Sequence, residues 1–119
     1  MFSMKKEIKK MEKHLKSKED ENYFLHAAKE LKSEMGDCSL MLMGGIRSPI
    51  DAEKFLEDGN ADLISFCRPL IREPNLPNRW KGGDKSNAHC ISCNSCFMTI
   101  PEGLHCAVLR RKEAKKSEK

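Results

Sequence analysis

Four of the six cysteines in this 119-residue chain fall in one short stretch, with the spacing C-x2-C-x2-C-x9-C. They are Cys90, Cys93, Cys96 and Cys106. Four thiolates at this spacing form the ligand set of one tetrahedral Zn²⁺ or of one iron–sulfur cluster. The N-terminus lacks the apolar segment of a signal peptide, so we expect a cytoplasmic, reducing environment, where clustered cysteines are more often metal ligands than disulfides. The alternative is a loop of four free thiols.

A second group of residues has the chemistry of an anion site. Residues 40–43 form an apolar run that leads directly into Gly44 and Gly45, and a second apolar run, 61–67, ends at Arg68. Paired glycines let the backbone turn sharply and let another group approach closely, because they carry no Cβ. Exposed backbone N–H groups and a guanidinium both favour an anion. If the two runs are neighbouring parallel strands, Arg68 lies beside the glycine turn and the site has the size of a phosphate.

A βαβ unit would position these groups. Residues 40–43 and 61–67 are typical of strands in a parallel sheet that is buried on both faces. Between them, Ser48 is suited to the N-cap of a helix over 50–58, and Pro49 to its first position. Two parallel strands at this separation need a right-handed helical crossover, so both strand ends face the same side.

The flanking segments are also expected to contain helices. Residues 1–18 are rich in lysine and place apolar residues four, three and four positions apart, which predicts a basic N-terminal helix or tail. Residues 19–35 show a stronger apolar face, and Gly36 is expected to end that helix. The proline-rich segment 70–80 suits a short helical turn with irregular pieces, and we expect Trp80 to pack it against the body.

Composition limits the classes of function. Hydrophobic residues make up 39% of the chain and charged residues 34%, so the core must be small for the length. The net charge of +4 is concentrated at the ends; residues 110–119 alone hold six Lys or Arg against two acids. No run approaches the roughly 18 apolar residues of a membrane span, so we expect no membrane association. No aromatic residues alternate with the C-terminal lysines, so we read the ends as solvated and do not expect nucleic-acid binding.

The two strand ends carry motifs that resemble those of the NADH:flavin oxidoreductase family, the relatives of old yellow enzyme. The matching motifs are GGIRSPxDAE at 44–53, ADLI at 61–64 and RPLIREPxLP at 68–77. The resemblance extends from about residue 19 to 108 and covers the C-terminal part of that family. It implies an α/β fold, namely the C-terminal βαβα part of a (β/α)8 TIM barrel, followed by a cysteine-rich loop. The two apolar runs would be the seventh and eighth strands.

The resemblance also implies a cofactor site. The phosphate of FMN would be bound by the two strand ends, at Gly44, Gly45, Ile46, Arg47, Cys67 and Arg68. The family usually has glycine where this chain has Cys67. The clustered cysteines lie where the dienoyl-CoA reductase and trimethylamine dehydrogenase branch carries a [4Fe-4S] cluster, with zinc as the alternative.

Four regions follow from this comparison: a basic N-terminal helix or tail (1–18), a partial TIM-barrel FMN-binding segment with the last two βα units (19–88), a cysteine cluster loop (89–108) and a basic C-terminal tail (109–119). A barrel needs about 250 residues. Strands one to six, which carry the family's substrate-binding pair and proton donor, have no counterpart here, so no catalytic residue is assigned. We therefore expect the product of a truncated or split gene, or of an incomplete gene model.

The expected function is that of the C-terminal segment of an FMN-dependent NAD(P)H:flavin oxidoreductase. Its partners would be FMN, NAD(P)H in the complete enzyme and a chain that supplies the rest of the barrel. One alternative is a small zinc or iron–sulfur binding module without enzyme activity, and another is a non-functional fragment.

Overall fold

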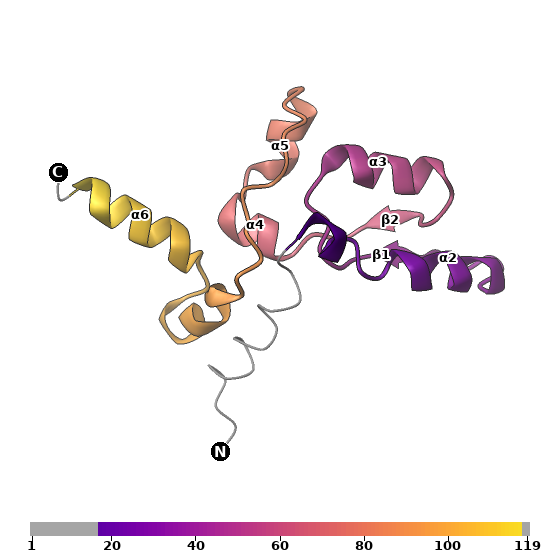
Figure 1. Cartoon of the computed structure of the whole chain (residues 1–119), viewed down its shortest axis with the longest axis horizontal. Helices are drawn as coiled ribbons and strands as arrows, with labels where there is room; N and C mark the ends of the chain where they lie inside the picture. The colour runs from indigo at the N-terminus through magenta and orange to yellow at the C-terminus, as the bar shows by residue number, and fades with distance from the viewer. Residues whose placement is uncertain (1–16, 118–119) are drawn as a thin grey trace, which may run out of the picture.

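The structure, a computed structural model, describes residues 17–117. In chain order its elements are η1 (Lys18–Asp20), α2 (Leu25–Glu34), β1 (Met41–Leu42), α3 (Pro49–Glu57), β2 (Leu63–Ile64), α4 (Arg68–Arg72), α5 (Leu76–Lys81), η2 (Ser95–Glu102) and α6 (Ala107–Ser117). In Figure 1 the strands lie between α2 and α3, and α6 lies at the opposite end of the molecule. The basic N-terminal region predicted over 1–18 falls almost entirely outside the described residues. The described part of the predicted C-terminal tail, 109–117, lies in helix α6.

The two strands form a parallel sheet, as the sequence predicts. Met41 pairs with Leu63 and Leu42 with Ile64, and the Ser65 N–H donates to the Leu42 carbonyl at 2.8 Å. Each strand is only two residues long, shorter than the apolar runs that predicted it. The crossover helix is α3, so the ends of both strands face the same side.

Helix α3 begins where the sequence signals predict. The Ser48 hydroxyl accepts a hydrogen bond from the backbone N–H of Asp51 at 3.1 Å, and Pro49 occupies the first turn. This N-cap satisfies one of the backbone donors that a helix start leaves unpaired. The capped start of α3 therefore fixes the position of the chain shortly after the Gly44–Gly45 turn.

The sheet is buried on one face only, as expected for two parallel strands without the rest of a barrel. Leu42 exposes 2% of its surface and belongs to the core, and Ile64 packs against that core. Their strand neighbours Met41 and Leu63 expose 57% and 50%. Because side chains alternate between the two faces of a strand, Met41 and Leu63 share the other face, which stays open within residues 17–117. The helices of the described chain cover only one face, and burial of both faces stays a prediction for a complete barrel.

Helix α2 starts at Leu25, six residues later than predicted. Asn22 has a left-handed backbone conformation (φ 56°), which interrupts a right-handed helix at that point. The next two side chains, Tyr23 and Phe24, contact each other edge to face, with ring centroids 4.6 Å apart. Gly36 (φ 55°) lies just beyond the helix end, as expected.

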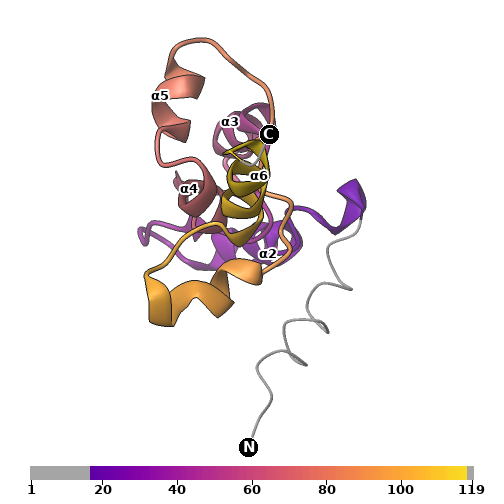
Figure 2. The same cartoon turned by 90° about the vertical axis from the view of Figure 1, so that its left-hand side faces the viewer.

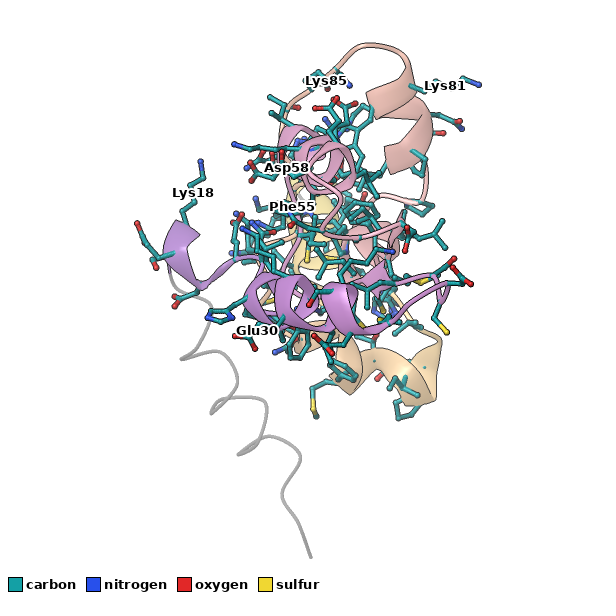
Figure 3. The ribbon with its side chains drawn as sticks, turned by 90° about the vertical axis from the view of Figure 1, so that its right-hand side faces the viewer. Lys18, Glu30, Phe55, Asp58, Lys81 and Lys85 are labelled. Carbon is teal, nitrogen blue, oxygen red and sulfur yellow. The ribbon has the colours of Figure 1, made fainter. Side chains whose placement is uncertain are left out.

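The core is small and lies between α2, α3 and the covered sheet face. Its buried members are Ala28, Leu42, Ile46, Ala52, Phe55 and Ala61. Half of them are alanines, which bury little apolar surface, whereas Phe55 contributes about 1.5–3 kcal/mol by its burial. Figure 3 shows Phe55 on α3 within the body of the molecule, while Lys18 and Lys81 project away from it.

The proline-rich segment forms two short helices, α4 and α5, and Trp80 packs against the body as predicted. The rings of Trp80 and Phe66 meet edge to face, with centroids 5.2 Å apart. Glu73 lies between these helices, pairs with Arg79 at 3.0 Å, and accepts the backbone N–H of His89 at 2.5 Å. Figure 2 shows the chain returning from α5 toward the cysteine-containing segment. Glu73 therefore holds the residue that precedes Cys90.

Candidate functional site

A cleft of about 650 Å³ opens at the carboxyl ends of the two strands. Its volume falls within the 300–1,000 Å³ typical of small-molecule sites. Its lining includes all six residues proposed for cofactor binding: Gly44, Gly45, Ile46, Arg47, Cys67 and Arg68. The structure thus brings together two groups of residues that are about twenty positions apart in the sequence.

The glycine turn is closely approached by aromatic rings. Gly44 and Gly45 have φ angles of 110° and 72°, a region that side-chain-bearing residues rarely adopt. A Cβ added at Gly44 would lie 2.7 Å from the Phe24 ring and 2.8 Å from the Tyr23 ring. The sequence predicts a close approach at this turn, but gives no sign that Tyr23 and Phe24 make it. Tyr23 also lines the cleft.

Arg47 is held by groups of the protein itself. Its Nη2 pairs with Glu21 Oε1 at 2.7 Å, and its Nη1 donates to the Cys90 carbonyl at 2.8 Å. Its Nε is buried and has no hydrogen-bond partner among the described residues. The Arg47 side chain therefore links the β1 end to the cysteine loop and to the segment before α2. Glu21 is a site residue that sequence reasoning missed.

Arg68 also reaches the cysteine loop. Its Nη1 donates to Asn94 Oδ1 at 2.5 Å and lies 3.5 Å from the Ser92 carbonyl. Both acceptors come from residues between the predicted ligands Cys90 and Cys96. These contacts were not predicted, because no local pattern links a strand end to a loop some 25 residues further along.

The four clustered cysteines share one small hollow. Cys90, Cys93, Cys96 and Cys106 all line it, together with Arg68 and Arg72. Arg72 Nη1 approaches Cys106 Sγ at 3.6 Å. Burial raises the pKa of the Cys90 and Cys96 thiols, and the positive charge of Arg68 opposes that rise. Thiols held in this way are protonated at neutral pH until a metal or another cation displaces the proton.

The cysteine hollow of the described chain does not contain an assembled metal site. Within residues 17–117, no three His, Cys, Asp or Glu side chains are grouped so as to hold a metal ion. A single zinc requires its sulfur ligands about 2.3 Å from one point. An iron–sulfur cluster places iron and sulfide between the cysteines, so its ligands surround a volume. The four cysteines that line the hollow are the donor type that either group requires, and their arrangement favours neither.

The cleft fits a phosphate-bearing, partly apolar ligand. The β-strand ends supply backbone N–H groups at a glycine turn and the Arg68 guanidinium. The remaining wall is largely apolar and includes Met43, Phe66 and Phe97, and it also contains the acidic residues Glu19 and Asp20. FMN combines a phosphate with a flat ring system, so this donor set fits it.

No helix in the described part of the chain has the length and apolar character needed to cross a membrane. No protein-family model matches the chain, and no solved structure matches it significantly.

Curated proteins with related sequences are redox enzymes. The chain is 32% identical to the 4,4'-dithiodibutanoate disulfide reductase of Rhodococcus erythropolis over 89 residues. This match covers 75% of the chain and 22% of the reductase. It is 33% identical to the NADH oxidase of Thermoanaerobacter brockii, over 66% of this chain and 12% of that protein. It is 35% identical to the NADH-dependent flavin oxidoreductase iccE of Talaromyces variabilis, over 48% of this chain and 14% of that protein. The chain thus spans less than a quarter of the length of these relatives.

Proposed function

The chain belongs to the NADH:flavin oxidoreductase family, of which it matches a C-terminal portion, and from this premise we propose that it supplies the FMN phosphate site of an FMN-dependent NAD(P)H oxidoreductase. The observation that carries the proposal is the cleft at the strand ends, which gathers a glycine turn and Arg68. Bound FMN would supply hydride transfer between a nicotinamide and an acceptor, since that chemistry belongs to the cofactor.

The residues of this chain would bind and orient the phosphate. Gly44 and Gly45 would contribute backbone N–H groups where their turn lines the cleft, and Arg68 offers charge-assisted hydrogen bonds. Ile46 and Arg47 would contribute through the backbone, because the Arg47 guanidinium is engaged with Glu21 and Cys90. No residue of this chain is proposed as catalytic.

The same proposal includes the rest of a (β/α)8 barrel, supplied by further chain. The open sheet face supports it, because Met41, Met43 and Leu63 present apolar side chains there that a barrel interior would bury. The relatives also contain several times more chain than the segment that matches.

Phosphorus NMR of FMN mixed with the full chain at millimolar concentration tests the phosphate site. We expect the ³¹P resonance to shift on addition of the chain, and Arg68→Gln to weaken binding about tenfold, since a charge-assisted hydrogen bond contributes about 1.5–3 kcal/mol. Arg72→Gln is the matched control, because Arg72 lies in the same helix but lines the cysteine hollow and not the cleft.

Riboflavin, which lacks the phosphate, distinguishes a phosphate site from a general ring site. Flavin fluorescence is the readout here, since riboflavin has no phosphorus; we expect riboflavin to bind more weakly than FMN and to be insensitive to Arg68→Gln. Equal affinities for FMN and riboflavin, or an unshifted ³¹P resonance with the wild-type chain, would contradict the assignment.

A second candidate is a small zinc or iron–sulfur module without enzyme activity. The observation that favours it is the set of four cysteines around one hollow. Metal and sulfide analysis of protein purified without oxygen separates the candidates. Iron with acid-labile sulfide would support a [4Fe-4S] cluster in a flavoenzyme segment, whereas one zinc per chain with no flavin binding would support the module. Neither metal nor flavin would indicate free thiols in a non-functional fragment.

A further inference from the structure

Arg68 forms a wall between the cleft and the cysteine hollow. The residues that line both spaces include Arg68 and Asn94. A ligand in the cleft and a metal in the hollow would both contact the surroundings of this side chain. The hydrogen bonds of Arg68 therefore determine whether binding in one space changes the affinity of the other.

Arg68 is held from the cysteine side through one nitrogen. Nη1 makes the 2.5 Å hydrogen bond to Asn94 Oδ1 and the longer contact to the Ser92 carbonyl. Asn94 and Ser92 expose only 5% and 8% of their surface. A guanidinium has five N–H donors, so this arrangement leaves Nη2 and Nε for a ligand in the cleft.

The loop adopts an uncommon backbone conformation to make these contacts. Ser92 and Asn94 both have left-handed φ angles, 56° and 55°. Asn tolerates this region better than most residues, whereas Ser does not share that preference. Left-handed residues persist where surrounding contacts fix them, and they cluster at functional sites. The Arg68 hydrogen bonds are among the contacts that hold this loop, together with the hydrogen bond from Arg47 to the Cys90 carbonyl.

We propose that Asn94 is a positioning residue that orients Arg68 toward the cleft, and that it thereby couples ligand binding in the cleft to occupancy of the cysteine hollow. The coupling rests on the proposed phosphate site; the positioning does not. A metal group on the cysteines would tether both ends of the segment that carries Asn94, so the hydrogen bond from Arg68 to Asn94, already present without metal, would be held more of the time before an anion arrives. Pre-ordering lowers the entropy cost of binding, so an anion in the cleft binds more tightly. By reciprocity, the anion also strengthens metal binding.

Two variants separate positioning from loop shape. Asn94→Gly keeps the left-handed backbone accessible but removes the acceptor, and Asn94→Asp keeps an acceptor oxygen at the same place. In the full chain labelled with ¹⁵N-arginine, we expect a slowly exchanging Arg68 guanidinium signal, assigned by its absence in Arg68→Gln. It should persist in Asn94→Asp and be lost in Asn94→Gly, while backbone amide signals of α3 stay unchanged. An Arg68 signal that survives in Asn94→Gly would overturn the proposal.

The coupling is tested by titrating FMN into the chain before and after anaerobic reconstitution with iron and sulfide. We expect reconstitution to tighten FMN binding about five- to tenfold in the wild type and to have less than a twofold effect in Asn94→Gly. Equal tightening in both proteins would overturn the coupling. If FMN binds to no form, the proposed phosphate site and the coupling both fail, and the Arg68 signal alone decides the positioning role.

Discussion

Gly44 illustrates how much one residue at the cleft depends on its neighbours. Its φ of 110° already disfavours a side chain, and the rings of Tyr23 and Phe24 fill the space that a Cβ would need. Gly83 has a similar φ, 98°, but no atom within 4 Å of the position of a Cβ. A comparison of substitutions at Gly44 and Gly83 therefore distinguishes the cost of backbone strain, which both share, from the cost of displacing neighbouring atoms, which arises only at Gly44.

We predict that Gly44→Ala destabilises the chain by more than Gly83→Ala. Both variants introduce a strained φ, which costs on the order of 1–3 kcal/mol. Gly44→Ala must in addition displace two aromatic rings. The measurement is the urea midpoint of the helical circular dichroism signal. Equal midpoints for the two variants would contradict the prediction, because they would show that displacing the Tyr23 and Phe24 rings has no measurable effect on the free energy of unfolding.

At the same scale, the sequence predicted residue types better than residue partners. It placed the Gly44–Gly45 turn beside Arg68, because parallel strands at βαβ spacing end on one side, and the structure gathers them in one cleft. It missed Glu21, Ser92 and Asn94, the partners of Arg47 and Arg68. Those contacts join segments that fold together only through tertiary packing, and no local pattern encodes them. Whether the cleft binds FMN stays a prediction.

Among the elements, α3 has the clearest local cause. Ser48 caps it, Pro49 starts it, and Gly59 in a left-handed conformation follows its end. We predict that Ser48→Ala destabilises the chain by about 1 kcal/mol, because the Asp51 N–H loses its acceptor. Ser48→Thr keeps the hydroxyl and is the control. Loss of α3 amide protection in hydrogen exchange for Ser48→Ala but not for Ser48→Thr is the expected result. Similar protection in both would contradict the capping argument.

The elements that were predicted less well depend on distant parts of the chain. Helix α2 begins six residues late, because Tyr23 and Phe24 lie over the glycine turn instead of extending the helix. The apolar runs are typical of strands covered on both faces, but such a run does not reveal how many layers a chain of this length can supply. The segment after Arg68, for which the sequence predicts one short helical turn, forms two short helices separated by residues 73–75.

At the scale of the whole molecule, the described chain has a thin core and an open apolar sheet face. Four of its eight buried hydrophobic residues are alanines, which limits the hydrophobic free energy available to offset chain entropy. The opposite face of the sheet presents Met41 and Leu63 to solvent. A two-stranded sheet covered on one side is marginal as an independent unit. We therefore expect the chain to be stable only when another protein surface covers that face of the sheet.

We predict that the dilute chain unfolds over a broad temperature range and that its sedimentation coefficient rises with concentration, because the open face associates. Met41→Lys should abolish the concentration dependence with little effect on the monomer, since Met41 is already 57% exposed. Ile50→Lys is the matched control, because Ile50 is 59% exposed but lies on α3 and not on the sheet. It should associate like the wild type. A sharp, cooperative transition from a dilute monomer would contradict this prediction, because it would show that the thin core suffices without a partner for the sheet.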